Sequence, residues 1–315
     1  MSAPTAPTPG AAPPLRIIAG PTGAGKSALA LALAARHGAW LLSADSRQIY
    51  RGFDIGTAKP TAEERARVVH RGVDIADPTE RWSAARWARD AGRWIDEAAA
   101  AGRPVIVCGG TGLWLRALVT PLAEEPPMDP DRRVAMQAAL ATLDTATVRR
   151  WVEVLDPARA ALGRTQLLRA AEVALLTGTR LSAAIAAGAG APRRAARWLI
   201  VDPGEALQDR LARRLDAMCA AGWAEEVRAL LGRVPADAPA WNACGYRAVQ
   251  EAVVAGAPTT TVREAVLVAT RQYAKRQRTW FRHQLGGEAS VTRLDPRAPD
   301  ALARAERWFL GGDDA

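Results

Sequence analysis

The chain has 315 residues, of which 49% are hydrophobic and 24% charged, with a net charge of +9. This length and composition allow one large domain, or one domain carrying an insertion, and exclude wholesale disorder. No apolar run approaches the ~20 residues of a membrane span, and the N-terminal MSAPTAPTPGAAPP lacks the basic and apolar parts of a secretory signal, so residues 1–14 are expected to form a disordered tail.

Basic charge is concentrated in residues 193–282, where 15 basic and 9 acidic side chains give a net charge of +6. This indicates a polyanionic partner, although a solvated arginine-rich face gives the same count. The chain has 39 arginines but only three lysines, Lys26, Lys59 and Lys275, so each lysine is expected where a compact ammonium fits better than a guanidinium. The three cysteines have no metal-ligand or disulfide spacing, which favours a reducing cytoplasm.

Four short apolar runs rich in β-branched residues, at 15–19, 39–43, 104–108 and 197–201, predict buried parallel strands. A helix from about residue 25 to 38 follows the first strand. A second helix, from about residue 83 to 101, precedes the third strand, with Ser83 as its N-cap. This alternation predicts an α/β fold with a doubly wound parallel sheet flanked by helices, and the motif GPTGAGKS after the first strand makes this sheet P-loop NTPase-like.

The pattern changes at the Pro-rich stretch 121–130, which leads into Ala- and Leu-rich helical segments over residues 132–187. The sequence GAGAP at 188–192 closes this region. We therefore expect an all-helical insertion at 121–192 within a core made of 15–120 and 193–315. Residues 203–286 again read as largely helical, and the last thirty residues carry no clear signal.

The segment GPTGAGKS matches the P-loop pattern G-x-x-x-x-G-K-[ST] and lies between a predicted strand and a predicted helix. Backbone N–H groups of such a loop surround phosphate oxygens, the lysine bridges them, and the serine hydroxyl can bind Mg²⁺. The predicted diphosphate-binding residues are therefore Gly20, Pro21, Thr22, Gly23, Ala24, Gly25, Lys26 and Ser27, with Ser27 as the metal ligand.

Two further polar residues follow the second and third predicted strands, Asp45 and Thr111. Singly, they can be explained as a helix cap and a turn residue. Because ligands of parallel sheets bind beyond the carboxyl ends of the strands, we expect both to face the P-loop, as a base and a hydroxyl donor. The third strand ends in glycines without a carboxylate, which disfavours an ATPase or a kinase.

Four segments in this order, GPTGAGKS, SADSRQIYRGFDIGTAKP, GGTGLWLRAL and KRQRTWFR, resemble the tRNA dimethylallyltransferases, over about residues 15–285. The resemblance implies dimethylallyl diphosphate as donor, Mg²⁺ as cofactor, and the adenine immediately 3′ of the anticodon as acceptor. It implies that Asp45 is the general base, that Thr111 meets the bridging oxygen of the diphosphate, and that Arg214 is a further diphosphate contact. We expect a monomer that binds the tRNA anticodon stem-loop.

The segment RQYAKRQRTWFR, residues 271–282, interleaves five basic residues with three aromatic ones, as RNA-binding surfaces do, although some of its aromatics can belong to the core. The resemblance implies tRNA contacts at Asp45, Ser46, Arg47, Gln48, Arg133, Thr165, Gln166, Leu167, Leu168, Arg169, Asn242, Ala243, Cys244, Gly245, Tyr246, Arg247, Lys275, Arg276, Gln277, Arg278, Thr279, Trp280, Phe281 and Arg282.

The chain departs from the family pattern D-x-x-R-x-x-R-A-x-E, since it has GRTQLLRAAE, with Gln166 in place of the first arginine and no aspartate. Arg169 matches the second arginine of that pattern, and the proposed catalytic residues lie outside this segment. Three other functions stay open at this point: a small-molecule P-loop kinase, a non-catalytic RNA-binding protein, and a prenyltransferase that acts on free adenylate.

Overall fold

The computed structural model describes residues 13–120, 122, 126–187, 194–285 and 290–312. The chain divides into two compact units, one formed by Met1–Val119 with Arg194–Ala315 and the other by Thr120–Arg193. We describe each unit by itself. The predicted tail and the segment 188–192 fall largely or wholly outside the described residues.

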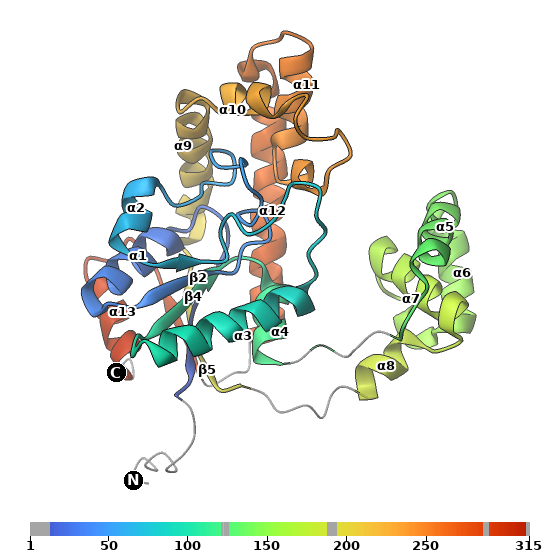
Figure 1. Cartoon of the computed structure of the whole chain (residues 1–315), viewed down its shortest axis with the longest axis horizontal. Coiled ribbons are helices and arrows are strands. Elements are labelled where there is room, and N and C mark those ends of the chain that lie inside the picture. The colour runs from blue at the N-terminus through green and yellow to red at the C-terminus, as the bar shows by residue number, and fades with distance from the viewer. Residues whose placement is uncertain (1–12, 121, 123–125, 188–193, 286–289, 313–315) are drawn as a thin grey trace. The chain divides into compact units, whose positions relative to one another are not determined.

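The larger unit is built on a six-stranded sheet in the order β3-β2-β4-β1-β5-β6, with every pair of neighbours parallel (Figure 1). This confirms the predicted α/β fold with a parallel sheet. The strands are β1 (Leu15–Ala19), β2 (Trp40–Ser43), β3 (His70–Arg71), β4 (Val105–Gly109), β5 (Ala196–Val201) and β6 (Val291–Leu294). Neither edge strand was predicted: β3 has only two residues, both polar, and β6 lies in the stretch without a clear signal.

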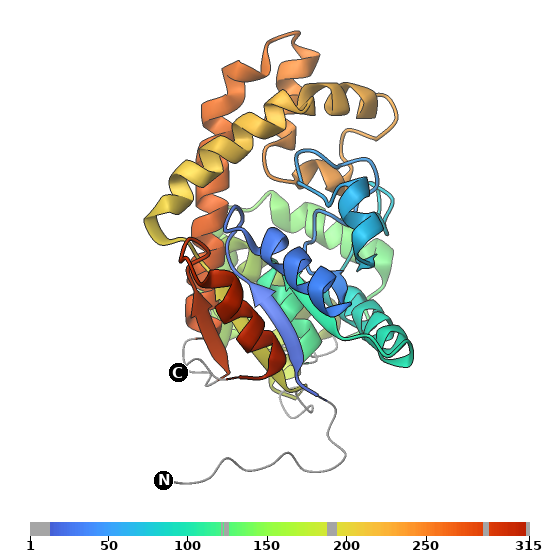
Figure 2. The same ribbon diagram turned by 90° about the vertical axis from the view of Figure 1, so that its left-hand side faces the viewer.

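Helices cover both faces of the sheet. On the face toward the viewer in Figure 2, α1 (Lys26–His37) lies beside α13 (Ala301–Leu310), and Leu33 and Trp308 join the apolar side chains of the strands in one core. On the other face, α3 (Ala84–Ala100) pairs with α4 (Gly112–Val119), and the rings of Trp87 and Trp114 stack 5.1 Å apart. The short α2 (Ala62–Arg67) lies between β2 and β3 in the chain.

The predicted helix ends agree with the structure. Helix α1 ends at Gly38, which adopts φ 62° so that its N–H reaches the carbonyl of Ala34. Helix α3 begins after Ser83, whose hydroxyl accepts the N–H of Arg86.

The chain returns from β5 into four helices, α9 (Leu207–Ala220), α10 (Trp223–Leu230), α11 (Tyr246–Val254) and the long α12 (Arg263–Leu285). Helix α12 runs beside the sheet and continues past it to α10 and α11 (Figure 1). Its buried residues Ala274, Gln277, Phe281 and Leu285 follow helical spacing, so one side of the helix faces the interior of the unit.

The smaller unit is helical, with α5 (Pro130–Ala141), α6 (Thr145–Leu155), α7 (Arg164–Thr177) and α8 (Leu181–Ala187). Leu140, Val148, Val152 and Leu167 form a separate apolar core. Asp129 and Asp144 cap α5 and α6 through their carboxylates. Pro130, predicted as the end of a linker, is the first residue of α5, where a missing N–H costs nothing.

Within the part of the chain that the structure describes, no single helix is long and apolar enough to cross a membrane. Helices α7 and α8 satisfy the length and composition test only together, across a bend of 88°.

Candidate functional site

The P-loop lies between β1 and α1, as its sequence pattern requires. Gly20 follows the last residue of β1 with φ 146°, and a Cβ at this position would lie 2.2 Å from the carbonyl oxygen of Val201 on the neighbouring strand. Gly25, with φ 98°, starts α1. Only glycine fits both positions, because one lacks space and the other requires a left-handed backbone.

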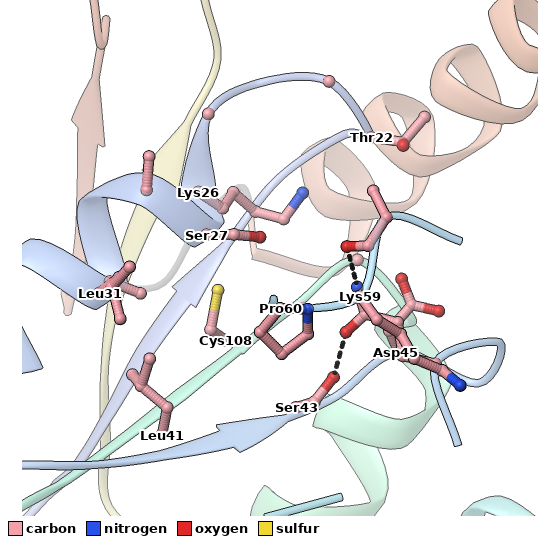
Figure 3. Close-up of a pocket in the computed structure, with 18 of the residues that line it drawn as sticks. Thr22, Lys26, Ser27, Leu31, Leu41, Ser43, Asp45, Lys59, Pro60 and Cys108 are labelled. Carbon is pink, nitrogen blue, oxygen red and sulfur yellow. Dashed lines mark hydrogen bonds between the residues drawn. The ribbon is translucent and has the colours of Figure 1, made fainter. Parts of the chain in front are cut away.

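Lys26 and Ser27 open α1 and face a cavity of about 620 Å³, which we call the first cavity (Figure 3). The ammonium of Lys26 is buried and donates to the carbonyl of Pro21 at 2.7 Å. Burial lowers the pKa of Lys26 to about 8, although the surrounding carboxylates oppose this shift. Within the described part of the chain this buried ammonium forms no ion pair with a carboxylate, so it is suited to an anionic ligand that restores the lost solvation.

Asp45 and Thr111 lie next to this cavity, each just beyond a strand. Asp45 lines the first cavity, and its Oδ1 accepts the N–H of Arg47 at 2.9 Å, so it stabilises a turn and does not cap a helix. The hydroxyl of Thr111 accepts the N–H of Ser46 at 3.1 Å, which joins the ends of β2 and β4. The structure therefore brings the P-loop, Asp45 and Thr111 to one edge of the sheet, as expected.

A second cavity, of about 540 Å³, shares Thr22, Asp45 and Arg214 with the first. Its remaining walls come mostly from α11, α12 and the loop before α11, with Asn242, Cys244, Arg247, Tyr273 and Arg276 among its lining residues. Burial and the nearby Asp45 carboxylate both raise the pKa of Tyr273, which places this phenol beside the shared residues. A ligand in either cavity reaches Asp45.

Helix α9 supplies three arginines to the first cavity, Arg210, Arg213 and Arg214. Burial lowers the pKa of Arg214, and Asp45 opposes that shift, so this guanidinium lies close to the predicted base. Arg210, which the sequence did not single out, donates from Nε to the carbonyl of Gly23 in the P-loop at 3.0 Å. The only sequence signal for a role of Arg210 at this site is its position one helical turn before Arg214.

A loop at residues 50–60 borders the first cavity and is fixed from two sides. The ammonium of Lys59 is 1% exposed and binds the carboxylates of Asp54 and Asp74 and the carbonyl of Tyr50. Glu226 on α10 accepts the N–H groups of Asp54 and Ile55. The second of the three lysines is therefore a buried structural residue, and its neighbour Ala58 keeps a left-handed φ of 48°.

Asp202, which the sequence did not single out, is a carboxylate at the end of a strand. Asp202 directly follows β5, beside the P-loop strand β1. Its carboxylate accepts two bonds from the guanidinium of Arg278 on α12. No carboxylate follows the third predicted strand directly, but Asp202 supplies one at the carboxyl end of the neighbouring part of the sheet, after β5.

Comparison with known proteins identifies the family to which this chain belongs. A family model described as IPP transferase matches residues 48–284, and one described as isopentenyl transferase matches residues 13–71. A tRNA dimethylallyltransferase of Myxococcus xanthus is 43% identical over 87% of this chain and 91% of its own length, and one of Sorangium cellulosum is 41% identical over 86% and 88%. The chain belongs to the IPP transferase family.

Solved structures agree with this assignment. A tRNA isopentenylpyrophosphate transferase of Bacillus halodurans, 31% identical, superposes with a TM-score of 0.66 over 95% of this chain and 96% of that one. A eukaryotic dimethylallyltransferase crystallised acting on tRNA gives 0.79 over 96% and 81%, and at 22% identity it shows the shared fold alone. This IPP transferase is accordingly a transferase with a P-loop fold.

The residues predicted to contact tRNA fall into an exposed and a buried set. Arg47, Asn242, Arg247, Lys275, Arg276 and Arg282 are exposed or partly exposed. Five others have side chains inside the protein: Leu167, Ala243, Tyr246, Gln277 and Phe281. Contact between RNA and a side chain is therefore expected from the first set.

Two predicted arginines of the helical unit share one partner. Glu172, 3% exposed, accepts bonds from Arg133, Arg169 and Gln137. Burial alone would raise the pKa of Glu172, but these hydrogen bonds outweigh it and lower the pKa. Thr165 and Gln166 lie exposed on the same helix, α7.

Proposed function

We propose that this IPP transferase moves the dimethylallyl group of dimethylallyl diphosphate onto the exocyclic amine of the adenine 3′ of the tRNA anticodon. The observation that carries the proposal is the meeting of two cavities at Thr22, Asp45 and Arg214. One cavity contains the P-loop, and the other is lined by arginines, amides and aromatics. Such a pair suits a diphosphate on one side and an extruded base on the other.

The donor is held through its diphosphate. We assign its oxygens to the P-loop N–H groups, the Lys26 ammonium and the Arg214 guanidinium, and this is supported by the P-loop, Lys26 and Arg214 lining the same cavity. These groups stabilise the negative charge that develops on the diphosphate when the allylic C1–O bond breaks. We assign to Thr111 the donation of its hydroxyl to the oxygen that leaves.

The acceptor amine is a weak nucleophile because its lone pair is delocalised into the purine ring. As its nitrogen forms a bond to C1, the electron pair of the C1–O bond leaves with the diphosphate and the amine loses a proton. Asp45 is our proposed general base for that proton, and its place in the lining of both cavities supports this role. The chemistry consumes no ATP.

A magnesium ion fits this site if the diphosphate supplies most of its ligands. Ser27 offers a hydroxyl at the P-loop and faces the cavity (Figure 3), whereas no cluster of three or more His, Cys, Asp or Glu side chains suited to a metal occurs among the described residues. Mg²⁺ commonly keeps waters and binds phosphates with few protein ligands. Bound there, it would add positive charge against the leaving diphosphate.

The exposed basic residues of α11 and α12, with those of the helical unit, are the proposed contacts of the anticodon stem-loop. Phosphate contacts by arginine and lysine supply much of the affinity of such a surface. The relatives named above as tRNA dimethylallyltransferases support the identity of both substrates.

The proposal is tested by incubating the protein with dimethylallyl diphosphate, Mg²⁺ and tRNA that lacks the modification, followed by digestion and mass spectrometry of the nucleosides. We expect one adenosine per tRNA to gain the mass of a five-carbon prenyl group. Prenylation of AMP without prenylation of tRNA would contradict the proposal, and so would phosphoryl transfer from ATP with no prenyl product.

A further inference from the structure

Gln277 occupies an unusual position for a residue in a basic, RNA-like segment. It lies on α12 between the exposed Arg276 and the partly exposed Arg278 but is itself only 6% exposed. Its side-chain Oε1 accepts the backbone N–H of Thr22 at 2.8 Å, and its Nε2 donates to the backbone carbonyl of Gly110 at 2.9 Å. Both ends of the amide are therefore engaged inside the protein.

These two bonds join the two loops on which the proposed chemistry depends. Thr22 belongs to the P-loop after β1, and Gly110 lies between β4 and Thr111. The strands β1 and β4 are parallel neighbours, so their loops emerge side by side at the same edge. A single side chain, 255 residues from Thr22 in sequence, thus spans from the phosphate-binding loop to the loop of the hydroxyl donor.

The surroundings of Gln277 are shaped for this contact. A Cβ on Gly110 would lie 2.3 Å from Nε2 of Gln277, so the glycine provides the space that the amide occupies. Three residues along α12, Trp280 packs in the same way against Gly112, where a Cβ would approach its ring to 2.4 Å. Arg278, the next residue, binds Asp202 after β5. Helix α12 is therefore attached to the loops after β1, β4 and β5.

We infer that Gln277 is a positioning residue for the transfer step, which fixes the P-loop at Thr22 relative to Thr111 and does not contact tRNA. This inference rests on the proposed function of the site. Loss of the amide would let the two loops separate, so the diphosphate and the hydroxyl that assists its departure would no longer be aligned. Misplacement of a reacting group by about 1 Å can cost ~100-fold in rate.

The test separates a positioning role from an RNA contact by measuring two substrates independently. Gln277→Met keeps the length and removes both hydrogen bonds. We expect kcat/KM for dimethylallyl diphosphate to fall about 10- to 100-fold, while the Kd for tRNA in the absence of donor changes less than about twofold. Arg276 is one position away and exposed, so Arg276→Gln is the matched control. We expect it to raise the Kd for tRNA and to leave the KM for the donor unchanged.

A second variant changes the other partner of the same contact, and it keeps the inference testable if Gln277→Met does not fold. Gly110→Ala keeps every hydrogen-bonding group but places a methyl against the Gln277 amide. We expect it to reproduce the donor defect alone, and to add little to that defect in a Gln277→Ala background, because the contact at 2.3 Å is then removed and only the Gly20 carbonyl oxygen remains close to the methyl, at 3.3 Å.

Two results would overturn the inference: a raised tRNA Kd with normal donor kinetics in Gln277→Met, or fully additive effects of Gly110→Ala and Gln277→Ala. If the unmodified protein forms no prenyladenosine, the proposed function fails instead, and this outcome is separate because it is measured before any substitution.

Discussion

The two cavities differ in how their polar groups are held. In the first cavity, Lys26, Thr22 and Arg210 are each fixed by a contact with another buried group or a backbone carbonyl. In the second cavity, Arg247 pairs with the exposed Asn242, and Arg276 lies at the surface. A small donor requires a preorganised site, whereas a large RNA can be bound by many exposed charges that each contribute little to the binding free energy.

The largest effect is expected at Asp45, one of the three residues that line both cavities. Asp45→Asn keeps an oxygen to accept the N–H of Arg47 but cannot take a proton from the amine. We expect kcat to fall about 1000-fold, within the range of general-base catalysis, with an unchanged tRNA Kd. Single-turnover assays with saturating donor measure this, and Asp45→Ala should lose as much. A rate within tenfold of the unmodified protein would exclude Asp45 as the base.

The loop beside the first cavity should depend on Lys59 for its stability. Lys59→Met removes the buried ammonium that Asp54 and Asp74 share. Because Asp54 is 56% exposed and Asp74 keeps Arg65 as a partner, we expect a loss of about 1–2 kcal/mol of unfolding free energy. Urea denaturation measures the loss. Exposed Lys275, replaced by Met, is the control and should change the unfolding free energy by less than about 0.5 kcal/mol.

The same cluster predicts a pH dependence of stability. Burial raises the pKa of Asp74, but hydrogen bonds from Lys59 and Arg65 outweigh it, so the pKa lies below its ordinary value of 3.8. The unfolded chain therefore binds the proton more readily, and the stability contributed by Asp74 is present above about pH 4 and lost as the pH falls through the lowered pKa. The loss of unfolding free energy on acidification should be smaller in Asp74→Asn. An equal loss in both proteins would contradict this assignment.

Removal of the P-loop ammonium should weaken donor binding more than any change in the second cavity. Lys26→Met is expected to raise the Kd for dimethylallyl diphosphate about 100-fold, because a charge-assisted contact to a largely desolvated anion is lost. Lys26→Arg should not restore binding, since the buried site beside Pro21 fits a compact ammonium. Calorimetric titration with donor alone measures both. Restoration by arginine would show that charge alone matters here.

Much of the first cavity could be predicted from the sequence because its parts follow strands. The P-loop and Asp45 follow short apolar runs that indicate buried strands, as does the neighbouring Thr111, and parallel strands bring such positions together. Gln277 and Arg210 could not be found in this way, since they reach the P-loop from helices far along the chain.

A weaker signal for Gln277 was nevertheless present. It lies three residues after Ala274 and four before Phe281, the spacing of a buried helical face, so a core position was predictable although its partners were not. The two-residue strand β3 gives no comparable signal, because a sheet edge can be extended by polar residues whose pairing is decided by the neighbouring strand.

The smallest effects are expected in the second cavity. Arg247→Gln should raise the KM for tRNA about three- to tenfold and leave the KM for the donor unchanged, because one phosphate or base contact among many is lost. The salt dependence is the sharper measurement: if Arg247 binds a phosphate, the slope of log Kd against log salt concentration should fall by about one, whereas a base contact would leave the slope unchanged. A hundredfold rise in the KM for tRNA from this one substitution would contradict the proposed difference between the cavities. Binding of tRNA would then depend on a single residue, as donor binding is expected to depend on Lys26.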